Sequence, residues 1–204
     1  FLNSNKNLDL FNIADNISGP YEKDGNITMM ESGYLPHIEH TKNLSVIDIL
    51  SIKNRNFTVV VDAVNGAASL ALPKMMESLG CKVYSLNCKP DGYFPRGTEP
   101  IPDHLIKLSE IVVQKNADVG FATDPDGDRL AVVDENGCAL GEEYTLTICA
   151  DGLLKSTGSN LPIVTNLSTT ISLDRIAENY GNLVIRTAVA CQCPGHGFAC
   201  IFYF

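Results

Sequence analysis

The sequence predicts an α/β fold: a three-layer α/β/α domain with a mixed sheet, plus the first βαβ unit of a second similar domain. Two successions of strand, helix and strand support this prediction, one between residues 57 and 86 and one between residues 162 and 186. A βαβ connection makes the two strands parallel and is almost always right-handed. The turn sequence Glu135-Asn136-Gly137 predicts a hairpin, which adds an antiparallel strand and makes the first sheet mixed.

The first βαβ unit begins with Phe57 to Val61, a β-branched run that suits a buried strand. Ala67 to Leu79 has helical spacing, and Gly80 after it predicts the end of that helix. Cys81 to Leu86 is predicted to be the next strand. Before this unit, Leu44 to Ile52 is predicted to form a short helix.

The rest of the first domain adds a helix, a strand and the hairpin. His104 to Lys115 predicts a helix, and Ala117 to Thr123 predicts the strand that follows it. One face of that helix is apolar and carries Leu105, Leu108, Ile111 and Val112. Leu130 to Asp134 and Cys138 to Leu140 are the expected arms of the hairpin. Glu142 to Lys155 predicts a further helix, whose inward residues are expected to be Leu146, Cys149, Ala150, Leu153 and Leu154.

The second βαβ unit is predicted from Pro162 to Thr165, Ser172 to Tyr180 and Leu183 to Arg186, as strand, helix and strand. Asn65 and Gly80 are 15 residues apart, as are Asn166 and Gly181, and each pair lies between two predicted strands. This internal similarity indicates a second domain of the same design.

Four segments are predicted along the chain. Residues 1–40 are polar and weakly periodic, and we expect the tail of a preceding domain or a linker. Residues 41–157 form the first domain, and residues 158–190 begin the second, which is truncated. Residues 191–204 shift abruptly to cysteine and aromatic residues and do not belong to that plan; their cysteine and histidine spacing matches no zinc-ligand pattern. The chain begins with Phe1, so we expect a piece of a longer protein.

The composition narrows the classes of partner. The chain has 204 residues and a formal net charge of −9, which argues against a general binder of nucleic acid or of anionic membranes. No apolar run approaches the roughly 20 residues of a membrane helix. Seven scattered cysteines suit a reducing compartment, so a cytoplasmic location is predicted. An acidic surface is compatible with a phosphorylated ligand, because a metal ion and nearby arginines can make the electrostatic potential at the binding site positive.

The strongest functional signal is the segment Phe121 to Leu130, which contains Asp124, Asp126 and Asp128. Three carboxylates this close repel one another unless a hard divalent cation takes them as oxygen ligands. They follow a predicted strand directly, and ligands of open α/β sheets bind at the carboxyl ends of strands. Arg129 adds a positive fork that suits a phosphate. We therefore predict a metal and phosphate site.

The loop has two other interpretations, a solvated turn and an EF-hand. An acidic turn is often only a solvated loop. The aspartates also fall at positions 1, 3 and 5 of an EF-hand loop, with Glu135 at position 12. Position 6 of that loop needs glycine but is Arg129 here, and the flanking segments are strand-like. An EF-hand is therefore not predicted.

The chain from Val59 to Val189 resembles the α-D-phosphohexomutases, namely phosphoglucomutase, phosphomannomutase and phosphoglucosamine mutase. The matching motifs are Val59-Val-Val-Asp62-Ala-Val-Asn65-Gly66, Phe94-Pro95, Glu99-Pro100, Ala117-Asp118-Val-Gly-Phe-Ala-Thr-Asp124-Pro-Asp126-Gly-Asp128-Arg129, Gly141-Glu142-Glu143-Tyr144-Thr145 and Asn166-Leu-Ser-Thr-Thr170. Arg96 to Pro100 also looks like the phosphate-gripping loop of the family's fourth domain, but at this position we interpret it as coincidence.

The resemblance implies a four-domain enzyme, of which this chain holds the second domain and the start of the third. In such enzymes a phosphoserine of the first domain exchanges its phosphoryl group with a hexose monophosphate. Mg²⁺, held by Asp124, Asp126 and Asp128, assists, and Arg129 is implied to contact the phosphate. The partners are then a hexose phosphate and domains I, III and IV.

The departures from the family pattern concern catalysis. No Ser-His-Asn-Pro stretch is present to carry the phosphoserine, and Ala190-Cys191 stands where the sugar-selecting loop is expected. No catalytic residue is therefore assigned, and the isolated chain is expected to be inactive. The alternatives are a noncatalytic Ca²⁺- or Mg²⁺-binding module and a structural remnant without a ligand.

Overall fold

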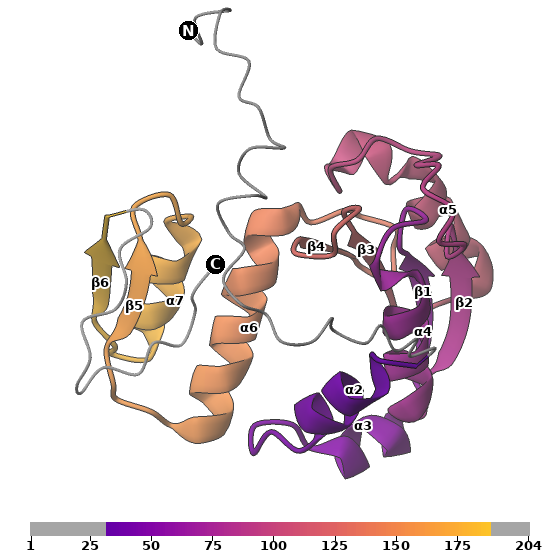
Figure 1. The fold of residues 1–204 in the computed structure, drawn as a ribbon. Helices are drawn as coiled ribbons and strands as arrows, with labels where there is room; N and C mark the ends of the chain where they lie inside the picture. The colour runs from indigo at the N-terminus through magenta and orange to yellow at the C-terminus, as the bar shows by residue number, and fades with distance from the viewer. Residues whose placement is uncertain (1–31, 189–204) are drawn as a thin grey trace, which may run out of the picture. The chain divides into compact units, whose positions relative to one another are not determined.

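The structure is a computed structural model, and it describes residues 32–188. The predicted anomalous tail, residues 191–204, and most of the predicted linker lie outside this range. A four-stranded sheet has the order β2-β1-β3-β4. Its strands are β1 (Thr58–Asp62), β2 (Lys82–Leu86), β3 (Val119–Thr123) and β4 (Leu130–Val133). β1 pairs in parallel with β2 and β3, and β3 pairs antiparallel with β4, so the predicted mixed sheet is confirmed (Figure 1).

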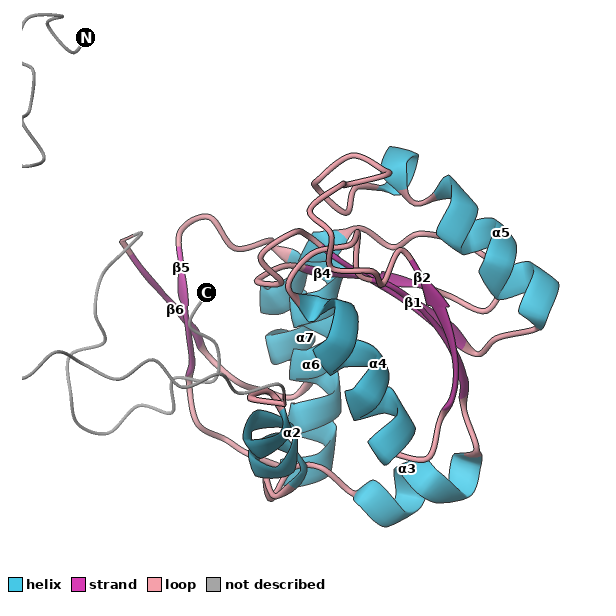
Figure 2. Cartoon of the chain, turned by 45° about the vertical axis from the view of Figure 1, so that its right-hand side comes forward, coloured by secondary structure: helices cyan, strands magenta, loops and turns pink. Residues whose placement is uncertain are grey.

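Helices cover both faces of this sheet, as the three-layer prediction requires. α4 (Ala68–Ser78) and α5 (Ile106–Lys115) lie on opposite faces in Figure 2. A short 3₁₀ turn, η1 (Pro102–His104), precedes α5. The core between the sheet and α5 consists of Val60, Leu105, Leu108, Val112, Ala117, Ala122, Ala131 and Val133. The predicted apolar face of α5 therefore supplies that core, and Ile111 packs at its margin.

The predicted hairpin turn follows β4, and a separate loop connects β3 to β4. The hairpin at residues 135–137 is closed by hydrogen bonds from the N–H of Asp134 to the C=O of Cys138 and from the N–H of Gly137 to the C=O of Asp134. Ala139 makes a single antiparallel bridge with Val133, so the second arm is shorter than predicted. The β3–β4 connection holds the aspartates instead.

The N-terminal helices differ from the prediction. α3 (Ile49–Arg55) overlaps only the end of the helix predicted over Leu44–Ile52, and an unpredicted helix, α2 (Leu35–Lys42), begins within the segment predicted as a linker. The side chain of Asp48 caps α3 by accepting from the N–H of Ser51, which fixes its start at Ile49. Local capping therefore placed the helix a few residues later than its apolar pattern suggested.

A second, smaller unit contains α6 (Glu142–Thr157), β5 (Ile163–Asn166), α7 (Ser172–Asn179) and β6 (Val184–Thr187). β5 and β6 pair in parallel, as a βαβ unit requires. Its core consists of Ala150, Leu154, Ile163, Leu173 and Ala177. Cys149 was predicted to face inward and is exposed, whereas Thr147 is buried. Among the helices of residues 32–188, none has the length and apolar character that a membrane span needs.

Candidate metal and phosphate site

Residues 124–129 form the candidate metal-binding loop (the metal loop), which leaves the carboxyl end of β3 and enters β4. Asp124 is the first residue after β3 and is only 8% exposed. Its Oδ1 accepts hydrogen bonds from the N–H groups of Gly127 and Arg129, both at 3.1 Å. Gly127 has φ +81°, a left-handed conformation that glycine adopts without steric cost. The first aspartate is thus fixed by the backbone of its own loop.

The structure brings the three predicted aspartates together. One carboxylate oxygen from each of Asp124, Asp126 and Asp128 lies within 4.8 Å of the other two. Asp124 is buried, whereas Asp126 and Asp128 are exposed. Three anionic oxygen donors at the end of a sheet fit a hard divalent cation of the Mg²⁺ or Ca²⁺ type. The flanking elements are both strands, so the loop is not an EF-hand, in agreement with the sequence prediction.

The carboxylates of this cluster perturb one another's pKa values. Burial alone would raise the pKa of Asp124, but hydrogen bonds from the backbone of Arg129, from neighbouring aspartates and from Gly127 leave that pKa below its ordinary value. The hydrogen bond with Asp124 and the negative charge of Asp126 raise the pKa of Asp128. A divalent cation would relieve the unfavourable proximity that holds the pKa of Asp128 high.

Arg129 lies beside the cluster with its guanidinium half-exposed. Its Nη1 is 3.5 Å from Oε1 of Glu99 and 3.6 Å from Oε1 of Glu142. Glu99 belongs to the connection before α5, and Glu142 is the first residue of α6. Two glutamates from distant segments therefore orient the predicted phosphate ligand, while its exposure leaves it accessible to an anion. From the sequence, Glu142 was expected to begin a helix and to belong to a family motif, and its contact with Arg129 was missed.

The turn between β1 and α4 supports the metal loop from one side. Val64 and Asn65 have φ 48° and 58°, an uncommon left-handed pair for residues other than glycine. A Cβ on Gly66 would lie 2.3 Å from the carbonyl oxygen of Pro125. The N–H of Ala67 donates to that same oxygen at 2.8 Å. The backbone of this turn thus lies directly against the metal loop.

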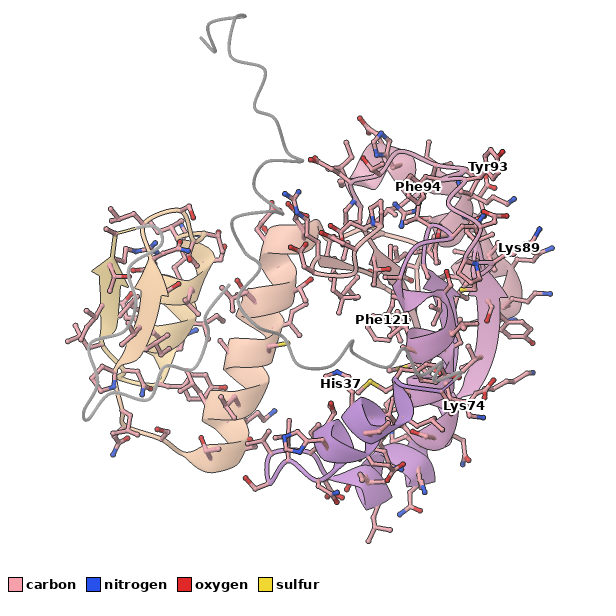
Figure 3. All side chains as sticks on the ribbon, in the orientation of Figure 1. His37, Lys74, Lys89, Tyr93, Phe94 and Phe121 are labelled. Carbon is pink, nitrogen blue, oxygen red and sulfur yellow. The ribbon has the colours of Figure 1, made fainter. Side chains whose placement is uncertain are left out.

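Asn65 connects the same turn to the segment after β2. Its Nδ2 donates to the C=O of Tyr93 at 3.0 Å, and its Oδ1 accepts from the N–H of Lys89 at 3.0 Å. Figure 3 shows Lys89, Tyr93 and Phe94 in this segment, beyond the carboxyl end of β2. The strand-end connections of β1 and β2 are therefore joined by one amide side chain.

Arg96 and Asp62 form a buried ion pair under the loop, which the sequence reasoning missed. The Nε of Arg96 is 3.0 Å from Oδ2 of Asp62, and the side chains are 8% and 2% exposed. Asp62 ends β1, and its carboxylate also accepts from Asn87 Nδ2 and from the N–H of Val64. The two charges are 34 residues apart, so no local pattern pairs them.

Known proteins resemble the chain in both sequence and fold. The family model described as "Phosphoglucomutase/phosphomannomutase, alpha/beta/alpha domain II" matches residues 33–137. A phosphoglucomutase/phosphomannomutase of Thermococcus kodakarensis is 44% identical over 155 residues, which cover 76% of this chain and 33% of that protein. A Pyrococcus furiosus protein named "Probable phosphoglucosamine mutase" is 37% identical over 180 residues, covering 84% of this chain and 39% of that protein.

A solved structure gives the same result. A phosphoglucomutase/phosphomannomutase family protein from Burkholderia thailandensis superposes with a TM-score of 0.64 and 27% identity, covering 77% of this chain and 33% of that one. The chain thus spans about a third of the length of the curated relatives it matches. The family model covers more than half of the chain, and it lies on the α/β/α unit that carries the aspartate loop. The chain belongs to the phosphoglucomutase/phosphomannomutase family.

Proposed function

We propose that this chain contributes the metal-binding second domain of a phosphohexomutase. Such an enzyme is an intramolecular phosphotransferase that interconverts hexose 1- and 6-phosphates through an enzyme phosphoserine. The observation that carries the proposal is the cluster of Asp124, Asp126 and Asp128, whose carboxylate oxygens lie within 4.8 Å of one another beside Arg129. Phosphoryl transfer depends on positioning and on charge neutralisation more than on covalent assistance, and this cluster can supply both.

Each residue of the site has a distinct role in this proposal. Asp124, Asp126 and Asp128 hold Mg²⁺, and Arg129 contacts the phosphoryl group or the sugar phosphate. When bound, Mg²⁺ would offset the negative charge on the transferring oxygens. Asp124 is already oriented by two backbone N–H groups, so little reorganisation is needed at that ligand. The glutamates that hold Arg129 keep its fork beside the carboxylates in the absence of phosphate.

The remaining parts of the enzyme are proposed partners. Domains I, III and IV would supply the phosphoserine and the sugar-binding and phosphate-binding loops, in the cytoplasm. The chain by itself would have no turnover, because no Ser-His-Asn-Pro stretch occurs among its residues. We propose residues 41–157 as domain II and residues 158–190 as the start of domain III.

Magnesium titration of the chain by calorimetry tests the metal site. The wild-type chain should bind Mg²⁺, and Asp126→Ala should lose that binding because it removes an exposed ligand without disturbing the core. Glu110→Ala, which removes an exposed carboxylate on α5, is the matched control and should bind as wild type. Wild-type affinity in Asp126→Ala would refute the assignment.

A second measurement separates the mutase from a noncatalytic Ca²⁺- or Mg²⁺-binding module. The chain is mixed with separately produced phosphorylated domain I and the remaining domains, and phosphoryl exchange with a hexose monophosphate is followed. The mutase proposal predicts exchange that needs this chain and is lost with Asp126→Ala. Metal binding without any such exchange would favour the noncatalytic module, and absence of both would favour a structural remnant.

A further inference from the structure

The side chain of Arg96 is buried next to the metal loop without being part of it. Arg96 lies in the connection between β2 and α5, and its side chain is only 8% exposed. A buried guanidinium is costly unless its charge is paired and its donors are satisfied. Asp62 pairs the charge through Nε at 3.0 Å. The partners of the remaining N–H donors of Arg96 therefore show which other groups the buried side chain holds in place.

Those donors bind backbone carbonyl groups at the ends of two strands. Nη2 donates to the C=O of Thr123 at 2.6 Å and to the C=O of Asp62 at 3.4 Å, and Nη1 donates to the C=O of Gly97 at 3.1 Å. Thr123 is the last residue of β3 and Asp62 the last residue of β1, and these strands are paired in parallel. One planar fork thus ties the carboxyl ends of both strands together.

Thr123 immediately precedes the first aspartate of the metal loop. We propose that Arg96 is a positioning residue of this loop, which holds the Thr123–Asp124 peptide against the end of β1 and so fixes where the Asp124 carboxylate lies. The inference rests on the proposed function, because it gives the loop its metal-binding role. Groups that orient a metal ligand in this way commonly change metal affinity without touching the ion.

Asp62, the ion-pair partner of Arg96, also contacts the β1–α4 turn, which packs against the metal loop. Its Oδ1 accepts from the N–H of Val64 at 2.9 Å, at the start of the turn whose Gly66 lies against Pro125. Asp62 also cancels the charge of Arg96. Because the ion pair has no net charge, Arg96 can hold the backbone below the proposed cation site without repelling the cation.

Two features hold the segment that carries Arg96. The ring of His104 packs against Gly97, where a Cβ would lie 2.0 Å from the ring, and Nδ1 of His104 is 2.8 Å from the C=O of Glu99. Glu99 in turn contacts Arg129 at 3.5 Å. Within four residues, the segment therefore contacts the peptide before the first aspartate and the arginine after the last one.

Arg96→Lys separates positioning from general stabilisation. A lysine ammonium can keep the charge pair with Asp62, but it lacks the planar fork that also reaches the C=O of Thr123 and of Gly97. Mg²⁺ affinity is measured by calorimetry at a temperature where circular dichroism shows the variant folded. We expect the Kd to rise by about tenfold or more. Arg175→Lys, an exposed arginine on α7, is the matched control and should leave the Kd unchanged.

Hydrogen–deuterium exchange of single amides provides a readout that needs no metal. The N–H groups of Gly127 and Arg129 donate to Asp124, and they should exchange faster in Arg96→Lys than in wild type, while amides of α7 exchange at the wild-type rate. A wild-type Kd together with unchanged exchange of these two amides would overturn the inference. Unchanged exchange would do so even if the Kd rose, because the loop would then not have been loosened.

If Arg96→Lys does not fold, the neutral pair Asp62→Asn with Arg96→Gln replaces it, and this double variant should again bind Mg²⁺ about tenfold more weakly or worse; a wild-type Kd would overturn the inference. If the wild-type chain binds no Mg²⁺, the proposed metal site is wrong. Exchange at Gly127 and Arg129 then decides by itself whether Arg96 holds the loop.

Discussion

Gly66→Ala should displace the metal loop by a calculable amount. The added Cβ would lie 2.3 Å from the carbonyl oxygen of Pro125 and 2.7 and 2.8 Å from its Cα and carbonyl carbon. Ordinary van der Waals contact begins at 3.4 Å, so the two backbones must separate by about 1 Å. The glycine does not have a positive φ, so the effect comes from this collision and not from backbone strain. The hydrogen bond from Ala67 to Pro125 must lengthen with it.

A displacement of this size is large on the scale of metal coordination. Coordination distances are fixed to within roughly 0.2 Å, and Pro125 lies between the proposed ligands Asp124 and Asp126. We expect Mg²⁺ affinity to fall by about tenfold or more, and stability to fall by about 1–3 kcal/mol because the added methyl group is overpacked. Calorimetry measures the affinity, and urea unfolding in the absence of metal measures the stability.

Gly152→Ala is the control for the same chemical change. Gly152 lies within α6, and nothing lies within 4 Å of the Cβ it would gain. Alanine in a helix interior should raise stability by about 0.5–1 kcal/mol and leave Mg²⁺ affinity unchanged. Wild-type affinity in Gly66→Ala would refute the reasoning that the β1–α4 turn sets the position of the metal loop.

Three further predictions concern the site itself. Asp124→Asn should lower Mg²⁺ affinity and also lower the free energy of unfolding in urea by about 1 kcal/mol, because the carboxylate accepts hydrogen bonds from two backbone N–H groups. Asp128→Asn should lower Mg²⁺ affinity without lowering the free energy of unfolding. Arg129→Ala should leave the Mg²⁺ Kd within about threefold of wild type but weaken the binding of a hexose phosphate to the Mg²⁺-loaded chain by about tenfold, measured by calorimetry. Mg²⁺ at a hundredfold excess over its Kd should raise the free energy of unfolding by about 2.7 kcal/mol, and EDTA should reverse the shift; no change in unfolding would contradict metal binding.

The elements of the first domain were predictable because their signals are local. β1 is a run of buried β-branched residues, and α4 ends before Gly80, whose φ of +81° explains why glycine stands there. α5 shows its buried face in its spacing. Errors arose where a neighbouring residue overrode the pattern, as when the Asp48 cap moved α3 towards the C-terminus.

The site was predictable only in part, for a different reason. The aspartate cluster is contained in one short loop, so its spacing is visible in the sequence. Its supports come from segments far away along the chain: Gly66 contacts Pro125, and Arg96 contacts Asp62 and Thr123. A single sequence does not show which of these distant residues meet.

In the second unit, too, an arginine binds the backbone of a turn that follows a strand. After β5, the chain again makes a polar turn before a helix, and Nη1 of Arg186 donates to the C=O groups of Asn166 and Thr169 at 3.2 and 2.8 Å, while Nη2 donates to Thr170 and pairs with Asp174. Arg186 lies on β6, whereas Arg96 lies beyond β2, so the two arginines do not occupy equivalent positions.

Both arginines answer the same requirement. Where a parallel strand turns into a helix, carbonyl oxygens at the turn lose their ladder partners before the helix can use them, and unpaired buried carbonyls are costly. A guanidinium has enough donors in one plane to satisfy several such oxygens while a single carboxylate neutralises its charge. In the first unit the satisfied carbonyl belongs to Thr123, the residue before Asp124, so the arginine that completes the fold can also position this proposed metal ligand.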